Sequence, residues 1–220
     1  MWYLTQRLVA FVGLLLLLPV FAFLWMLVKA TSEGPFLYSQ TRPGLHGVPI
    51  RIWKIRTMVP GSDKNLQNAR CVLNNNPNVT YVGRILRILK LDELPQLWNI
   101  VIGQMAFVGP RPIAFSLHQE LCMMIPGFEK RTGVRPGLSN IGQVSIEENA
   151  SGDQLIHDWR ERFEAETHYL RNRSIGYDCV VILLTVLYLL RKAWRLRGKR
   201  PRTKIASQHP EYLLHQSRTA

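Results

Sequence analysis

The apolar and polar positions divide the chain into a long apolar segment near its start and a more polar remainder. Residues 8–28 form an uncharged stretch of about 21 residues between Arg7 and Lys29, and a helix of that length can cross the hydrocarbon layer of a bilayer. Pro19 lies in the middle, where a proline removes a backbone donor and clashes with the carbonyl group four residues earlier. We therefore predict a membrane anchor over residues 1–30 with a kink at Pro19.

The residue pattern alone leaves three arrangements open for this anchor. A kinked helix can span the membrane, or it can bend back and leave on the side where it entered. The basic residues at both ends of the stretch fit the second arrangement at least as well as the first. A cleavable secretory signal is disfavoured. The apolar core of such a signal is normally about 7 to 15 residues followed by small residues, whereas residues 23–27 read Phe-Leu-Trp-Met-Leu.

Two short segments after the anchor predict a β-hairpin. Residues 35–40 and 50–56 carry β-branched and aromatic side chains, and the turn-forming run 42–47 separates them. In the second strand Lys54 and Arg56 would share one face. Two cations on one face can grip a phosphate group, although a solvated strand face is the alternative interpretation.

The next part of the chain has helical periodicity. Residues 82–91 place Arg84, Arg87 and Lys90 three apart among apolar residues, which is typical of an amphipathic helix on anionic headgroups or of an ordinary surface helix. We predict that a further helix follows, capped by Asp92. Its buried apolar stripe would be Leu94, Leu97, Trp98 and Val101.

The remaining segments complete an α+β fold that is mainly helical. Residues 61–80 predict a loop over the site, and 127–143 a glycine- and proline-shaped loop. Residues 153–172 predict a polar helix, and 179–190 an apolar helix too short to cross a bilayer, which is therefore a core or an interfacial helix. We expect one domain over residues 31–194 and a basic, disordered tail over 195–220.

Composition and charge narrow the range of partners. The 220 residues suffice for one cored domain with additions. A net charge of +13 draws the molecule to polyanions: nucleic acid, anionic lipid or phosphorylated substrates. The basic tail lacks the interleaved aromatic residues on which bases stack, so we expect no nucleic acid partner. Cys71, Cys122 and Cys179 are too far apart for a zinc site or redox dithiol and indicate a reducing compartment.

Asp92 and Glu93 are the candidate catalytic pair. Consecutive residues at a helix start point about 100° apart, so they are poorly placed to share a proton and better placed for two different roles. Asp92 could attack phosphorus and form an acyl phosphate, while Glu93 could bind Mg²⁺ with substrate phosphate oxygens. Arg111, between two prolines, could hold phosphate oxygens with two parallel hydrogen bonds. Taken alone, such a pair is more often a helix cap than a catalyst.

Six motifs in a fixed order lie between Tyr38 and Gln143. They are YSQTRPG at 38–44, KIRTM at 54–58, VGRILR at 82–87, LDELPQ at 91–96, VGPRP at 108–112 and RPGL at 135–138. Together they resemble the bacterial sugar transferase family, the monotopic polyprenyl-phosphate phosphoglycosyl transferases. The chain looks like the minimal catalytic form of that family.

The resemblance implies transfer of a sugar 1-phosphate from a nucleotide diphosphate sugar, expected to be a UDP-sugar, to undecaprenyl phosphate. This is the first membrane step in assembly of a glycoconjugate such as polysaccharide, O-antigen, capsule or glycoprotein, at the cytoplasmic face of the bacterial inner membrane. It implies that Asp92 is the nucleophile, that Glu93 helps to hold Mg²⁺ and that Arg111 lies in the phosphate-binding part. We assign further substrate or phosphate binding to Lys54, Arg56, Arg87 and Gln143.

The resemblance also favours a re-entrant anchor broken at Pro19, with amphipathic interfacial helices around the active site. Leu18 stands where the family often has Ser, which leaves the freed backbone groups without a local side-chain partner. Departures at 103–106, 78–80 and 139–143 leave the sugar and nucleotide open.

Two rival interpretations remain from the sequence. One is a membrane-anchored basic binding protein without catalysis, and the other is an inactive member of the same scaffold. Oligomeric state, including a homodimer, is also open.

Overall fold

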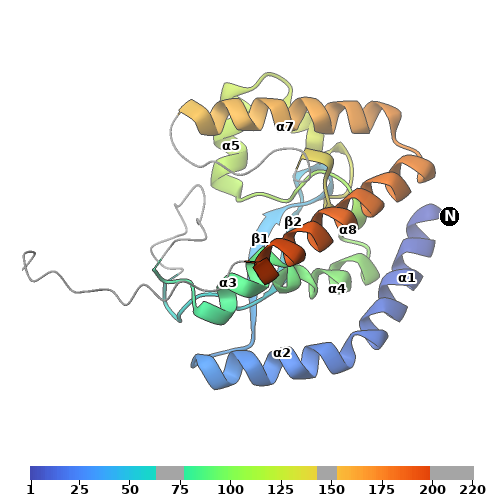
Figure 1. Ribbon diagram of the computed structural model, residues 1–220. Helices are drawn as coiled ribbons and strands as arrows, with labels where there is room; N and C mark the ends of the chain where they lie inside the picture. The colour runs from blue at the N-terminus through green and yellow to red at the C-terminus, as the bar shows by residue number, and fades with distance from the viewer. Residues whose placement is uncertain (63–76, 143–152, 199–220) are drawn as a thin grey trace, which may run out of the picture.

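The computed structural model describes residues 1–62, 77–142 and 153–198, which form a mainly helical α+β fold (Figure 1). Its helices are α1 (Trp2–Leu16), α2 (Leu18–Thr31), α3 (Tyr81–Ile88), α4 (Gln96–Val101), α5 (Phe115–Met124), α7 (Asp153–Asn172) and α8 (Ile175–Gly198). Its strands are β1 (Leu37–Pro43), β2 (Pro49–Ile55), β3 (Ala106–Val108) and β4 (Gly137–Ser139). Three 3₁₀ turns join them: η1 (Leu45–Gly47), η2 (Leu91–Glu93) and η3 (Phe128–Gly133).

Helices α1 and α2 form the predicted bent apolar pair. They meet at Leu17 and differ in direction by 57°. Pro19 lies in the first turn of α2, so its ring would clash with the carbonyl group of Leu15 if the helix continued straight. Among the described residues no single helix is long and apolar enough to cross a bilayer, whereas this pair passes that test together.

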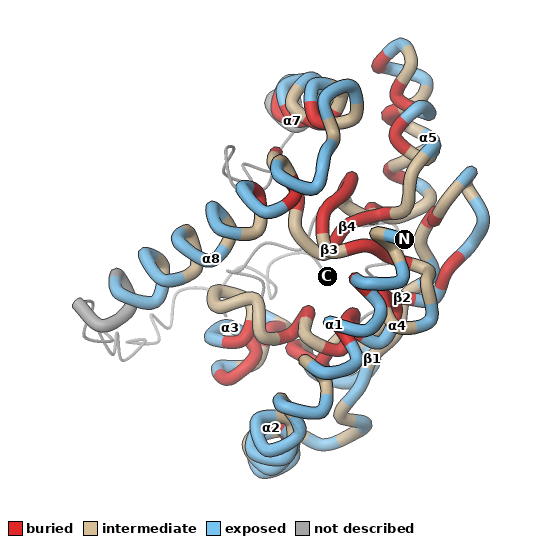
Figure 2. The backbone as a smooth tube through the Cα atoms, turned by 90° about the vertical axis from the view of Figure 1, so that its right-hand side faces the viewer, coloured by how far each residue is buried: buried red, intermediate tan, exposed pale blue. Residues whose placement is uncertain are grey.

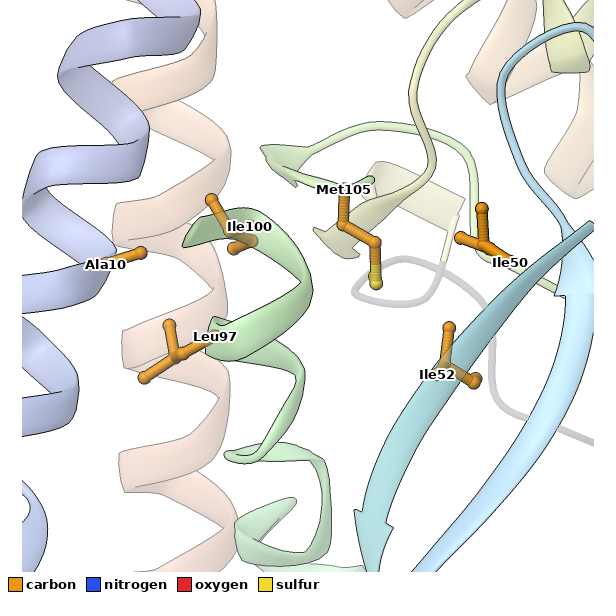
Figure 3. Packing of buried hydrophobic residues seen from close by; sticks show 6 residues of the cluster. All are labelled: Ala10, Ile50, Ile52, Leu97, Ile100 and Met105. Carbon is orange, nitrogen blue, oxygen red and sulfur yellow. The ribbon is translucent and has the colours of Figure 1, made fainter. Parts of the chain in front are cut away.

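The predicted hairpin consists of β1 and β2, which pair antiparallel from Leu37 opposite Ile55 to Pro43 opposite Pro49. A core cluster joins this hairpin to the anchor: Ala10 of α1, Ile50 and Ile52 of β2, Leu97 and Ile100 of α4, and Met105 (Figure 3). Alternate residues of β2 face this cluster, as the period of a strand requires. Helix α4 therefore packs on one face of the hairpin, and α1 packs on the other side of α4 (Figure 3).

A second, parallel pair of strands was not predicted. Ala106 of β3 lies opposite Gly137 of β4, and Val108 opposite Ser139. The backbones of Gly109 and Gly137 approach so closely that a Cβ atom at Gly137 would overlap the Gly109 amide nitrogen. This contact brings the segment after β3 against the start of β4.

The prediction that a helix begins at Asp92 is wrong. Asp92 lies in η2, its side chain caps no helix, and α4 begins only at Gln96. Lys90 takes a left-handed backbone conformation with φ 57°, which turns the chain between α3 and η2 and ends α3 at Ile88. Trp98, predicted to be buried, is 48% exposed.

Two further boundaries differ from the prediction. Helix α8 begins at Ile175 and ends at Gly198, so it is longer than the apolar run 179–190 and extends past the predicted start of the tail. Its outer face, like that of α2, is largely exposed (Figure 2). Only residues 61–62 and 77–80 of the predicted loop 61–80 are described, and Val79 forms an antiparallel bridge with Met58, which precedes the loop.

Candidate active site

Asp92 is a buried carboxylate with an incomplete set of partners. It is 6% exposed, and its Oδ1 atom accepts no hydrogen bond from the described residues. Burial raises the pKa of Asp92, and so does the neighbouring charge of Glu93, although the charges of Lys54, Lys90 and Arg87 oppose the shift. Its ionised form is therefore less well stabilised than that of an ordinary surface aspartate, which suits a nucleophile.

Glu93 lies in the opposite environment. Its Oε1 atom is 3.1 Å from Arg111 Nη2, 3.3 Å from Lys54 Nζ and 3.9 Å from Lys90 Nζ. Burial alone would raise its pKa, but the charges of Arg111, Lys54 and Lys90 hold the pKa of Glu93 well below its usual range. The two adjacent acids are thus electrostatically distinct, as two different roles require.

Arg87 belongs to the same group of charges and is aimed by the packing of α3. Its Nε atom donates to Thr57 Oγ1 at 2.8 Å. Thr80 caps α3 by accepting a hydrogen bond from the Gly83 amide at 2.9 Å, and the Gly83 backbone lies directly against Thr57. Only a glycine at 83 permits this approach.

The structure separates the partners of Lys54 and Arg56, which the hairpin pattern placed on one face. Lys54 reaches Glu93, whereas Arg56 Nη2 donates to the Ser32 carbonyl oxygen at 2.8 Å and to Ser32 Oγ at 2.9 Å. Arg56 therefore ties the hairpin to the end of α2. The predicted phosphate role of Arg56 stays a prediction, and Gln143 lies outside the described residues.

Sequence reasoning missed several residues around this site. Lys90 was assigned to a basic helix face, but its left-handed backbone directs it to Glu93. Behind Arg111, the buried residues Arg131, Asn140 and Glu166 form a hydrogen-bonded cluster. A glutamate on a charge-mixed helix carries no local signal for such a contact. The spacing of Lys90 and Glu93, three apart, could have indicated their pairing.

The acid pair fits a magnesium ion only if substrate shares in binding it. The described residues contain no cluster of three or more His, Cys, Asp or Glu side chains suited to a metal. Mg²⁺ usually takes one or two protein carboxylates together with phosphate oxygens and water, so three are not required. Asp92, whose buried Oδ1 has no hydrogen-bond partner among the described residues, and Glu93 beside it meet that smaller requirement.

The site thus combines a buried carboxylate pair with surrounding cations, and Leu91 beside the pair packs against Leu24 and Val28 of the bent apolar helix pair. Residues 3–192 match the family model described as "Bacterial sugar transferase". The chain belongs to this family.

Three relatives illustrate the similarity. The UDP-glucose:undecaprenyl-phosphate glucose-1-phosphate transferase of Klebsiella pneumoniae is 37% identical over 175 residues, covering 79% of this chain and 36% of the relative. The protein of the same name from Caulobacter vibrioides is 38% identical, covering 85% and 70%. The UDP-N-acetylgalactosamine-undecaprenyl-phosphate N-acetylgalactosaminephosphotransferase of Aeromonas hydrophila is 32% identical, covering 83% and 42%. This chain thus spans only 36% of the Klebsiella relative's length.

Proposed function

We propose that this protein transfers a sugar 1-phosphate from a UDP-sugar to undecaprenyl phosphate, as the first membrane step of polysaccharide or other glycoconjugate assembly. The observation that carries the proposal is the site of Asp92, a buried carboxylate with one oxygen that no described residue hydrogen-bonds, beside a glutamate held by three cations. The names of relatives support both substrates, but they specify two different sugars. The sugar therefore stays open.

The proposed reaction has two displacements at one phosphorus atom. A carboxylate oxygen of Asp92 attacks the phosphorus that carries the sugar and forms an acyl phosphate. The bond from that phosphorus to the bridging oxygen breaks, and the nucleoside monophosphate leaves with the electron pair. An oxygen of undecaprenyl phosphate then attacks the same phosphorus. The bond to Asp92 breaks, the carboxylate is regenerated and the lipid diphosphate sugar is released.

The cations of the site suit the charge of these substrates. Arg111, Lys54 and Lys90 neutralise Glu93 in the structure and are close enough to bind diphosphate oxygens when substrate enters. Arg87 adds a further positive charge near Asp92. Glu93 would hold Mg²⁺ together with phosphate oxygens, and the bound ion would neutralise charge on the diphosphate.

The contacts of the bent helix pair support a re-entrant anchor at the cytoplasmic face of the bacterial inner membrane. At the start of α1, Gln6 Oε1 accepts a hydrogen bond from the Phe107 amide at 2.9 Å, and Trp2 Nε1 donates to Asp178 at 2.8 Å. At the far end of α2, Leu24 and Val28 pack in the cluster that contains Ile55, Val82 and Leu86. A straight span would carry these two ends to opposite sides of the membrane.

Helix α8 supports the same placement. It exposes the apolar side chains of Ile175, Val180, Leu183, Leu184, Val186, Leu187, Leu190 and Trp194. Basic residues Arg191 and Lys192 lie near the end of this run, between Leu190 and Trp194, and basic residues beside an apolar face favour an anionic membrane surface. We propose that α8 is the interfacial helix.

A topology experiment tests the re-entrant anchor. Tags placed at Met1 and Ala220 should both be inaccessible to an impermeant reagent outside intact cells, because both ends of the anchor stay on the cytoplasmic side. Both tags should react after the membrane is permeabilised, which shows that each tag can be labelled. A Met1 tag that reacts in intact cells would establish a full span instead.

The activity itself is tested with purified protein and a panel of UDP-sugars. We expect nucleoside monophosphate release with one or few of them, at a rate that depends on added undecaprenyl phosphate and Mg²⁺. A membrane-anchored binding protein without catalysis would release none with any sugar.

A further inference from the structure

Glu166 of α7 is a buried acidic residue, and both of its carboxylate oxygens accept hydrogen bonds. It is 1% exposed. Its Oε1 atom accepts hydrogen bonds from Arg131 Nη2 at 2.9 Å, Asn140 Nδ2 at 2.9 Å and the Arg111 backbone amide at 3.3 Å, while Oε2 accepts from Arg131 Nε at 3.0 Å. A buried carboxylate with a two-point guanidinium partner is geometrically fixed.

The side chains that bind Glu166 also donate hydrogen bonds to the backbone of residues 109–111. Arg131 Nη2 also donates to the Arg111 carbonyl oxygen at 2.9 Å, and Asn140 Nδ2 also donates to the Gly109 carbonyl oxygen at 3.0 Å. The amide and the carbonyl group of Arg111 are thus both held by the Glu166–Arg131 ion pair. Pro110 and Pro112 restrict the backbone on either side.

The side chain of Arg111 extends from this fixed backbone to the acid pair, where Nη2 lies 3.1 Å from Glu93 Oε1. A continuous chain of contacts therefore leads from Glu166 through the backbone of Arg111 to Glu93. Small displacements of a substrate-positioning group cost large factors in rate.

We propose that Glu166 is a positioning residue for the reaction: it acts through Arg131 and Asn140 to fix the Arg111 guanidinium against Glu93 and the substrate diphosphate. This inference rests on the proposed function, because it assigns a role in that site. Stability alone explains the cluster poorly, since buried ion pairs often stabilise no better than well-packed apolar residues. Glu166, Arg131 and Asn140 each hydrogen-bond to the backbone of residues 109–111, the segment that carries Arg111.

The test is a double-variant cycle. Glu166→Asp keeps the charge but shortens the side chain by one methylene group, so the contacts loosen without leaving Arg131 unpaired. We expect kcat to fall about ten- to a hundredfold, the range typical of residues that orient a reactive group. In an Arg111→Ala background, the same substitution should change kcat less than about twofold, because the group that Glu166 positions is already gone.

The cycle separates positioning from a structural role. A loss of folded protein would reduce activity by the same factor in both backgrounds, and that result would overturn the proposal. Glu161→Asp, on an exposed face of the same helix, should leave kcat unchanged in both. Thermal unfolding of all variants is measured alongside.

Failure of the proposed function gives a different result. If the unmodified protein releases no monophosphate from any nucleotide sugar, the transferase assignment fails. The same variants are then titrated with inorganic diphosphate and Mg²⁺. Equal weakening of diphosphate binding by Glu166→Asp in both backgrounds would overturn the positioning role independently of turnover.

Discussion

Asp92→Asn should reduce monophosphate release at least about a thousandfold, because an amide cannot replace a carboxylate nucleophile. Mixed with a UDP-sugar labelled in the sugar and no lipid acceptor, the unmodified protein should retain label, and the variant none. Denaturing electrophoresis measures the retained label. Addition of undecaprenyl phosphate should discharge it from the unmodified protein. Label or full turnover in the variant would exclude Asp92 as the nucleophile.

The same substitution should not destabilise the protein, which distinguishes loss of chemistry from loss of fold. Burial raises the pKa of Asp92 above its value in the unfolded chain. The ionised carboxylate therefore lowers stability at neutral pH, and this cost appears as pH rises through the unfolded and folded pKa values. Asn removes the charge at nearly constant volume. We expect a Tm equal to or above that of the unmodified protein at neutral pH.

Local patterns predicted the elements whose signals are local. The bend of the anchor follows from Pro19, which excludes a straight helix whatever surrounds it. The hairpin follows from two alternating segments around a turn-rich run, and its register needs no distant partner. The motifs also indicated Asp92 and Glu93 as the acid pair, and their catalytic role stays a prediction. No local pattern indicated that burial and charge would shift their pKa values in opposite directions.

The geometry around Asp92 could not be predicted because tertiary contacts and one backbone angle determine it. The apolar spacing from Leu94 to Val101 fits a helix, but Lys90 turns the chain in a left-handed conformation and α4 starts four residues after Asp92. The β3–β4 pair joins three-residue strands far apart in sequence, which leave no periodic signal. Glu166 reaches Arg111 across 55 positions.

Glu93→Gln should reduce kcat/KM by about two powers of ten or more. A bound metal ion stabilises transition-state charge by several kcal/mol, and each 1.4 kcal/mol or so is tenfold in rate. The variant should also require at least about tenfold more Mg²⁺ for half-maximal activity. Initial rates over a series of Mg²⁺ concentrations measure both effects. The protein should still fold, because Lys54, Lys90 and Arg111 keep 20–24% of their side-chain surface in water.

The magnesium dependence separates two roles for Glu93 that the ion pairs alone do not distinguish. If Glu93 only holds Lys54 and Arg111 in place, its substitution lowers the rate but leaves the Mg²⁺ requirement unchanged. If Glu93 also binds the metal, the rate and the Mg²⁺ requirement change together, because the lost carboxylate is a metal ligand as well as the ion-pair partner of Lys54 and Arg111. Glu161→Gln, at an exposed position of α7, is the matched control and should alter neither quantity. A reduced rate with an unaltered Mg²⁺ requirement would therefore leave Glu93 as a charge partner and exclude it as the metal ligand.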